Sequence, residues 1–132
     1  MPIAMWIRPL FLIAAAYDGV LGVAFLVALG PIYQALNIPP PNHAGYVQFP
    51  AALLIVFAIG FLMIARDPVR YRDFIILGIL LKISYCSVVF GHWFLSSIPG
   101  IWVVFAWCDL AFLAAFVAAF RSLEPVPAPG SL

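Results

Sequence analysis

The chain has 132 residues, of which 67% are hydrophobic and 8% charged, and its formal net charge is +1. A soluble domain usually has about 25% charged residues, and a fold of this length cannot bury so much apolar surface, because small domains have a large surface for their volume. The sequence therefore predicts an integral membrane protein, and it excludes nucleic-acid binding because no basic patch is present to neutralise phosphates.

Four apolar stretches are long enough to cross a bilayer, whose hydrocarbon core of roughly 30 Å needs about 20 helical residues. They cover residues 9–30, 46–65, 74–95 and 98–120. None shows the alternating polarity of a membrane β-strand. We expect an all-α membrane protein, a four-transmembrane-helix bundle that forms one domain over residues 1–122. A disordered Pro-rich tail is expected at 123–132.

The first stretch, 9–30, could alternatively be interpreted as a cleaved secretory signal rather than a membrane span. It follows Arg8 and contains Ala14-Ala15-Ala16, which imitates the cleavage site of a secretory signal. The apolar run resumes at once from Val20 to Leu29, as expected for a full span. At helical spacing, Asp18 shares one face with small and aromatic residues. These are Phe11, Ala14, Gly22 and Phe25.

The connection after the first span, residues 31–45, has no formal charge and contains three consecutive prolines at 39–41. Pro31 is predicted to open a single helical turn through Leu36, and Asn37 is predicted to end it. Because this loop is uncharged and apolar, we expect it to lie on the mouth of the bundle.

The second span, 46–65, is followed by the charged connection from Arg66. Asp67-Pro68 resembles a helix start, with Asp capping free amides and Pro at the first helical position, and it predicts that the third helix begins there. Five arginines lie at the two termini and in this connection, whereas residues 31–45 and 96–97 carry no Lys or Arg. These five are Arg8, Arg66, Arg70, Arg72 and Arg121. The asymmetry predicts that both termini are cytoplasmic.

The third and fourth spans each contain a charge, as the first does. At about 1.5 Å per residue, Asp18 lies roughly 15 Å beyond Arg8, and Lys82 lies roughly 15 Å beyond Arg72. Asp109 lies roughly 18 Å before Arg121. All three positions therefore fall near the midplane of the bilayer.

Three unpaired charges at this depth would cost roughly 8–10 kcal/mol on an insertion scale. We therefore expect Asp18, Lys82 and Asp109 to converge as a midplane polar cluster inside the bundle, with Tyr17 and Tyr85 beside them. The cluster has two interpretations: it fixes helix pairing, or it forms a functional site. The expected pocket is lined by the first, third and fourth spans, and its catalytic residues are unknown.

A second polar group, an outer polar rim, is predicted from His43, Gln48 and His92 at the boundary of the other leaflet. A bis-His haem between the two histidines is conceivable, but His43 lies in a loop, and interfacial hydrogen bonding is favoured. Cys86 and Cys108 lie inside spans and are expected to act as small apolar residues. Metal-ligand spacing, a phosphate loop and a GxSxG elbow are absent from the sequence.

The whole chain resembles the small bacterial four-helix membrane proteins of the DoxX-like grouping. The resemblance is carried by Tyr17-Asp18, Ala65-Arg66-Asp67-Pro68, Lys82 and Trp107-x-Asp109-Leu110. It implies a bacterial inner-membrane protein, and some members are thought to accompany quinone-linked redox enzymes. The topology is also similar to that of the sterol-isomerase and sigma-2-receptor group, four-helix proteins with intramembrane carboxylates.

Two functional hypotheses follow. The first is an accessory or assembly subunit of a larger membrane complex, or a self-associating homo-oligomer, because the segments outside the spans are too short to hold a soluble active site. The alternative is an enzyme or carrier that binds an apolar small molecule, such as a quinone, an isoprenoid or a sterol-like compound, with Asp18 or Asp109 exchanging protons. Proton conduction is less favoured, since the ionisable groups form one layer plus a rim.

Overall fold

The computed structural model of this protein describes residues 3–123 and residue 125. Over these residues the chain is all-helical, with five helices. They are α1 (Ile7–Val27), α2 (Leu29–Ala35), α3 (Gly45–Arg66), α4 (Phe74–Leu95) and α5 (Gly100–Ser122). All but α2 are long and apolar enough to cross a membrane, as expected of a multi-pass membrane protein. Most of the predicted Pro-rich tail at 123–132 lies outside the described residues.

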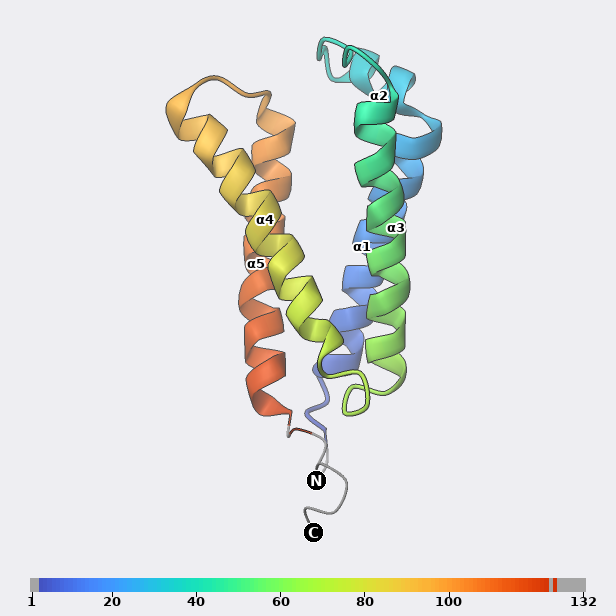
Figure 1. Ribbon diagram of the computed structural model, residues 1–132, viewed down its shortest axis with the longest axis vertical. Helices are drawn as coiled ribbons and strands as arrows, with labels where there is room; N and C mark the ends of the chain where they lie inside the picture. Colours follow the sequence, from blue (N-terminus) through green and yellow to red (C-terminus); the bar gives the residue numbers. More distant parts are fainter. Residues whose placement is uncertain (1–2, 124, 126–132) are drawn as a thin grey trace.

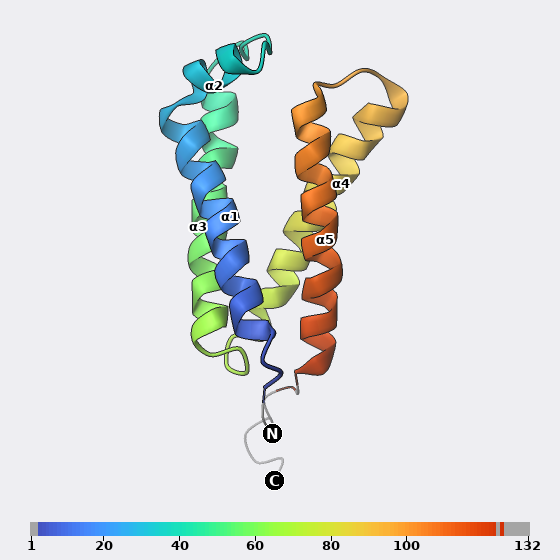
Figure 2. The same cartoon turned by 180° about the vertical axis from the view of Figure 1, so that it is seen from behind.

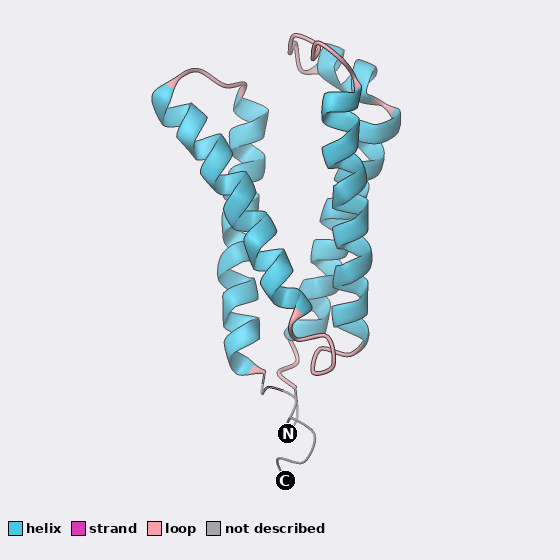
Figure 3. Cartoon of the chain, viewed as in Figure 1, coloured by secondary structure: helices cyan, strands magenta, loops and turns pink. Residues whose placement is uncertain are grey.

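The four long helices form two antiparallel hairpins (Figures 1 and 2). The N-terminal hairpin is α1 packed along α3, with α2 between them in sequence, and the C-terminal hairpin is α4 packed along α5. The hairpins approach each other at the end where α3 connects to α4, which we call the closed end. They diverge towards the end that carries α2, which we call the open end (Figure 3).

Helix α1 lies very close to α3 because its contact face carries small residues. A Cβ atom at Gly22 would lie 2.6 Å from the carbonyl oxygen of Ala51, which is closer than real atoms approach. Ala58 is buried in the same interface, where a Cβ atom at Gly19 would lie 3.5 Å from its side chain. Small residues favour this contact because helix association in lipid depends on close packing rather than on hydrophobic burial.

At the closed end, all four long helices meet around a cluster of phenylalanines. Phe11 of α1 stacks on Phe116 of α5, with ring centroids 4.9 Å apart, and Phe61 of α3 lies 5.2 Å from Phe116. Gly78 of α4 leaves room for these rings, since a Cβ atom there would lie 2.8 Å from the Phe61 ring. This cluster is the only place in the described chain where a residue of every long helix enters one buried aromatic core.

The connection at the open end differs in detail from the predicted turn. Helix α2 begins at Leu29, before Pro31, which is tolerated in the first turn because its missing amide would be free there. Asn37 ends the turn as predicted, with a left-handed φ of 55°. Tyr33 of α2 is buried against Phe25 and Trp102, and burial raises the pKa of its phenol.

The prediction that α4 begins at Asp67-Pro68 is wrong. Asp67 is the C-cap of α3, and its Oδ1 accepts the amide of Arg70 at 3.2 Å at the start of a run of turns over residues 68–73. Helix α4 begins at Phe74. The turns lead directly into α4 through backbone bonds such as that from the amide of Ile75 to the carbonyl of Arg72. The side chain of Arg72 reaches the end of α5, where its Nε donates to the carbonyl of Leu123 at 2.9 Å.

Candidate functional site

The three charged residues predicted at the midplane converge on one ion cluster. Lys82 of α4 is 1% exposed, and its Nζ donates to both carboxylate oxygens of Asp18 on α1, at 3.0 and 3.1 Å. The same Nζ donates to Oδ1 of Asp109 on α5 at 3.0 Å. An ammonium group has three hydrogen-bond donors, so all the donors of Lys82 are used. Lys82 thereby ties the two hairpins together across the bundle.

The cluster has one carboxylate more than it has ammonium groups. Asp18 has both oxygens bonded to Lys82, whereas Oδ2 of Asp109 accepts no hydrogen bond from any described residue. Asp109 is also the more accessible partner, with 10% of its side chain exposed against 1% for Lys82. The excess negative charge of the cluster is therefore assigned to the carboxylate of Asp109, whose Oδ2 is the oxygen without a hydrogen bond.

Aromatic rings surround the ammonium group. The Lys82 Nζ lies 5.6 Å from the ring centroid of Tyr17 and 5.3 Å from that of Phe112, within the range in which a ring face attracts a cation. The hydroxyl of Tyr17 is buried and has no hydrogen-bond partner among the described residues. Tyr17 thus belongs to the predicted cluster through its ring and leaves its hydroxyl uncommitted.

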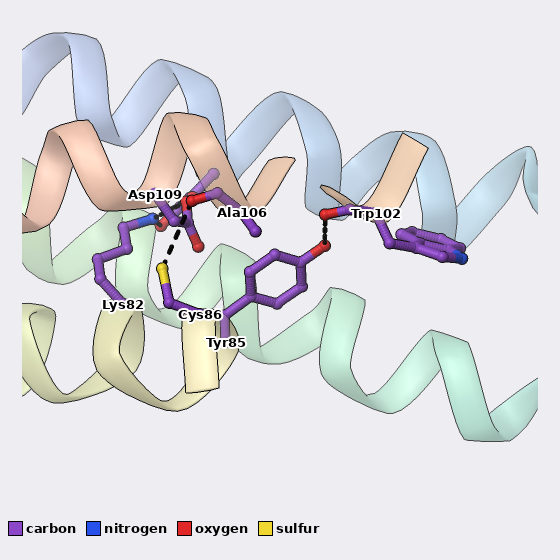
Figure 4. A network of polar contacts seen from close by, with 7 residues as sticks. Lys82, Tyr85, Cys86, Trp102, Ala106 and Asp109 are labelled. Atoms are coloured by element: carbon purple, nitrogen blue, oxygen red, sulfur yellow. Dashed lines mark hydrogen bonds and ion pairs between the residues drawn. The ribbon is translucent and has the colours of Figure 1, made fainter. Parts of the chain in front are cut away.

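Tyr85 and Cys86 extend the polar contacts from the cluster towards the open end (Figure 4). The Tyr85 hydroxyl donates to the carbonyl of Trp102 at 3.0 Å, and the Cys86 thiol donates to the carbonyl of Ala106 at 3.4 Å. Both bonds join α4 to α5. They hold the C-terminal hairpin together without using the carboxylate of Asp109.

A cleft of about 250 Å³ lies next to the cluster, between the two hairpins. Its polar lining consists of side chains from the cluster and its two tyrosines, and the remaining lining is apolar apart from the indole N–H of Trp102. The polar members are Tyr17, Asp18, Tyr85 and Asp109. Towards the open end the cleft is bounded by aromatic residues of α1 and α5. They are Phe25, Trp102 and Phe105. Pro50 and Leu53 of α3 are exposed lining residues, so the cleft opens at the side of the bundle along α3.

Helix α3 supplies a wall of this cleft that the sequence did not predict. We expected the pocket to be formed by the first, third and fourth spans alone, but six lining residues come from the second. They are Val47, Pro50, Ala51, Leu53, Leu54 and Phe57. The interior proline at position 50 was the only local signal, because the other five are ordinary apolar residues.

The residues of the predicted outer polar rim are not brought together. Nδ1 of His43 accepts the amide of Gly45 at 3.0 Å, and the Gln48 amide donates to the carbonyl of Leu26 at 3.4 Å, all within the N-terminal hairpin. His92 is exposed in the last turn of α4, on the other arm of the open end (Figure 1). A haem ligated by His43 and His92 would have to span the two arms.

Among the described residues, no group of three or more His, Cys, Asp or Glu side chains is arranged to hold a metal ion. Cys86 is buried and Cys108 is half-buried, and both are free thiols. The described site can offer charge compensation, hydrogen bonding and proton exchange at Asp109.

Comparison of the chain with protein-family models, with curated proteins and with solved structures gives no match. The DoxX-like resemblance therefore stays a prediction.

Proposed function

We propose that this protein binds a small molecule from the membrane in the cleft between its hairpins, where the molecule meets the carboxylate of Asp109. The observation that carries the proposal is the position of the cleft. It is lined by apolar side chains except at one end, where a charged cluster borders it. Ligand sites typically combine an apolar cavity with a few convergent polar groups.

A purely structural cluster would not need this cleft. An ion triad that only fixes helix pairing is most stable when every polar atom is satisfied and packed. Here Lys82 and Asp18 meet that condition, whereas Asp109 keeps one unbonded oxygen at the cleft, and the buried hydroxyl of Tyr17 has no partner. An accessible carboxylate oxygen without a partner, on a cleft, supports binding.

The opening along α3 suits a ligand that arrives from the bilayer. The residues at its edge, Pro50 and Leu53, are apolar and exposed. Quinones, isoprenoids and sterol-like compounds are the ligand classes expected from the sequence, with Asp109 as the proton-exchanging group. A carrier and an enzyme would both use such a site.

We also propose the cellular setting. Placing the five arginines in the cytoplasm puts the closed end of the bundle on the cytoplasmic side, because all five lie at that end. Arg8 and Arg121 are in the first turn of α1 and the last turn of α5, and Arg66, Arg70 and Arg72 are at the end of α3 and in the α3–α4 connection. The resemblance to DoxX-like proteins supports a bacterial inner membrane.

The second candidate function is the accessory or assembly subunit, including self-association. It is favoured by the divergence of the hairpins, which pack along their partners within each hairpin but only sparsely against each other. A helix of a partner protein, or of a second copy, would then cover the sides of the open half. Recovery of a stable complex after mild solubilisation would support this candidate.

A thermal-shift experiment tests the binding proposal. Purified protein is heated with a quinone, an isoprenoid alcohol or a sterol-like compound. A ligand at about 100 times its dissociation constant should add about 2.7 kcal/mol of stability. Leu21→Trp fills the cleft, whereas Val20→Trp places the same side chain at the neighbouring exposed position. We expect the shift to disappear in Leu21→Trp only. Equal shifts in both variants would contradict binding in the cleft.

A further inference from the structure

We infer that the ligand carries a cationic hydrogen-bond donor, such as a protonated amine, which binds Oδ2 of Asp109 while its apolar body fills the cleft. This inference rests on the proposed function and narrows it to one chemical class. We call the polar end of the cleft, formed by Tyr17, Asp18, Tyr85 and Asp109, its floor. The inference follows from counting the free hydrogen-bond donors and acceptors at this floor, and from counting its charges.

Nearly all donors at the floor are already used. The three N–H bonds of Lys82 go to Asp18 and Asp109, and the Tyr85 hydroxyl donates to a backbone carbonyl. Two donors are uncommitted: the buried hydroxyl of Tyr17, and the indole N–H of Trp102, which lies towards the open end of the cleft rather than at its floor. The uncommitted acceptors are Oδ2 of Asp109 and the oxygens of the two tyrosines, which can each still accept. The floor therefore favours a ligand that donates.

The charge inventory leads to the same class. Lys82 is shared by two carboxylates, so the ionised cluster has a net charge of −1. An excess charge in a medium of low dielectric is costly unless it is paired. A ligand cation at Asp109 would complete a balanced set of two carboxylates and two cations. A carboxylic acid would add a second uncompensated anion, and the carbonyl of a quinone would bring an acceptor, not a donor, to the ionised Oδ2 of Asp109.

The shape of the cleft fits an amphiphile rather than a compact cation. Beyond the polar floor, the lining is formed by apolar side chains of all four long helices. The opening past Pro50 and Leu53 lets an alkyl tail continue towards lipid. Polar and apolar ends are thus separated along one direction, as they are in a long-chain amine.

The test uses one alkyl chain with four head groups. Wild-type protein in lipid nanodiscs is titrated with dodecyldimethylamine, dodecyltrimethylammonium, dodecanol and dodecanoic acid, and binding is followed by thermal shift. The protonated tertiary amine should bind about tenfold or more tightly than dodecanol, as expected for a hydrogen bond between charged groups. The quaternary analogue keeps the charge but has no N–H bond and should lie between them. Dodecanoic acid should bind most weakly.

Two variants test whether the preference for the amine over dodecanol depends on Asp109. Asp109→Asn removes the charge and keeps an acceptor for Lys82, so it should reduce the preference for the amine over dodecanol about tenfold while dodecanol binding persists. Asp73→Asn is the matched control, because Asp73 is an exposed carboxylate at the start of α4 whose side chain makes no capping hydrogen bond. It should leave the preference unchanged.

The outcomes separate this inference from the function on which it rests. If dodecanol binds as tightly as both cations, and Leu21→Trp abolishes its binding, the cationic ligand class is wrong and the cleft remains a binding site. An amine preference that survives in Asp109→Asn also overturns the inference. If none of the four compounds shifts the wild type, the cationic ligand class is wrong, and the thermal shift with the quinone, the isoprenoid alcohol and the sterol-like compound decides the binding proposal separately. Should Asp109→Asn not fold, the order of the four head groups on wild-type protein still decides.

Discussion

The closed and open halves of the bundle are built from similar residues and packed in different ways. In the closed half, Phe11, Phe61 and Phe116 are buried against one another, and Gly78 of the fourth helix lets them meet. In the open half, Trp102 and Phe105 are only half-buried and border a cleft. Aromatic content alone therefore does not decide whether a membrane bundle is solid or hollow.

The ion cluster lies at the boundary between these halves. Lys82 is one helical turn from Gly78, which belongs to the closed core, and about one turn from Tyr85, which lines the cleft. Asp18 is likewise between Phe11 and Phe25 on α1. The bonds of Lys82 are thus the polar tie between the hairpins where tight packing ends and the space for a ligand begins.

The strongest way to break this arrangement is to remove the ammonium group. Lys82→Met leaves two buried carboxylates without a partner and should lower the free energy of unfolding by about 3–5 kcal/mol. The double variant Lys82→Met/Asp18→Asn should recover part of this loss, because the remaining charge of Asp109 borders the cleft. Unfolding in mixed detergent measures both. If the double variant is as unstable as Lys82→Met with Asp18→Asn itself neutral, the residues are not coupled.

The second prediction compares a phenylalanine of each half. Phe116→Ala should cost about 3 kcal/mol, the lower end of the range for a buried Phe, because helix association in lipid lacks the hydrophobic contribution of soluble cores. Phe105→Ala should cost clearly less, since its ring already borders a space. The same unfolding assay provides the measurement. Equal losses would show that the two halves are equally well packed.

These expectations show what the sequence could determine. The depth of Asp18, Lys82 and Asp109 followed from counting residues to the flanking arginines, and it succeeded because a helix rises by a constant distance per residue. Their convergence is observed because a charge in lipid is too costly to leave unpaired. The four spans likewise match the four long helices, with ends that differ by no more than three residues.

The other features of the fold and the site could not be predicted, because they depend on contacts between helices that the amino-acid composition does not reveal. Both faces of a span are apolar in lipid, so the pairing of α1 with α3 and the wall that α3 gives the cleft were not predicted. Asp67-Pro68 has the local pattern of a helix start, but residues 68–73 form successive turns and α4 begins only at Phe74. His43 and His92 share an end of the bundle, and the divergence of the hairpins puts them on different arms (Figure 1).

The third prediction compares a glycine that is packed closely against a neighbouring helix with a glycine that has open space around it. Gly22→Ala should cost about 1–3 kcal/mol, the usual range for overpacking, because the new methyl group meets the backbone oxygen of Ala51. Gly60→Ala is the control: no atom lies within 4 Å of a Cβ there, and alanine should stabilise the helix by up to about 1 kcal/mol. Destabilisation by both changes would argue against the close α1–α3 contact.

The smallest expected effect distinguishes the two tyrosines of the cleft. Tyr85→Phe removes the hydrogen bond to Trp102 and should cost about 0.5–1.5 kcal/mol. Tyr17→Phe removes a buried hydroxyl without a partner, so it should be neutral or slightly stabilising in the absence of a ligand. Chemical or thermal unfolding of the two variants side by side provides the measurement. A clear loss in Tyr17→Phe would reveal a partner for its hydroxyl.

The bond between Asp18 and Lys82 joins residues 64 positions apart, and this separation has a consequence for biogenesis. During synthesis, α1 enters the membrane long before α4 leaves the ribosome, and the nascent hairpin of α1 and α3 offers Asp18 no basic residue at its depth. Its carboxylate must therefore stay protonated, hydrated or held by the insertion machinery until Lys82 arrives. The second hairpin then brings the ammonium group of Lys82 and the carboxylate of Asp109. The complete cluster can therefore form only after the two hairpins have packed against each other.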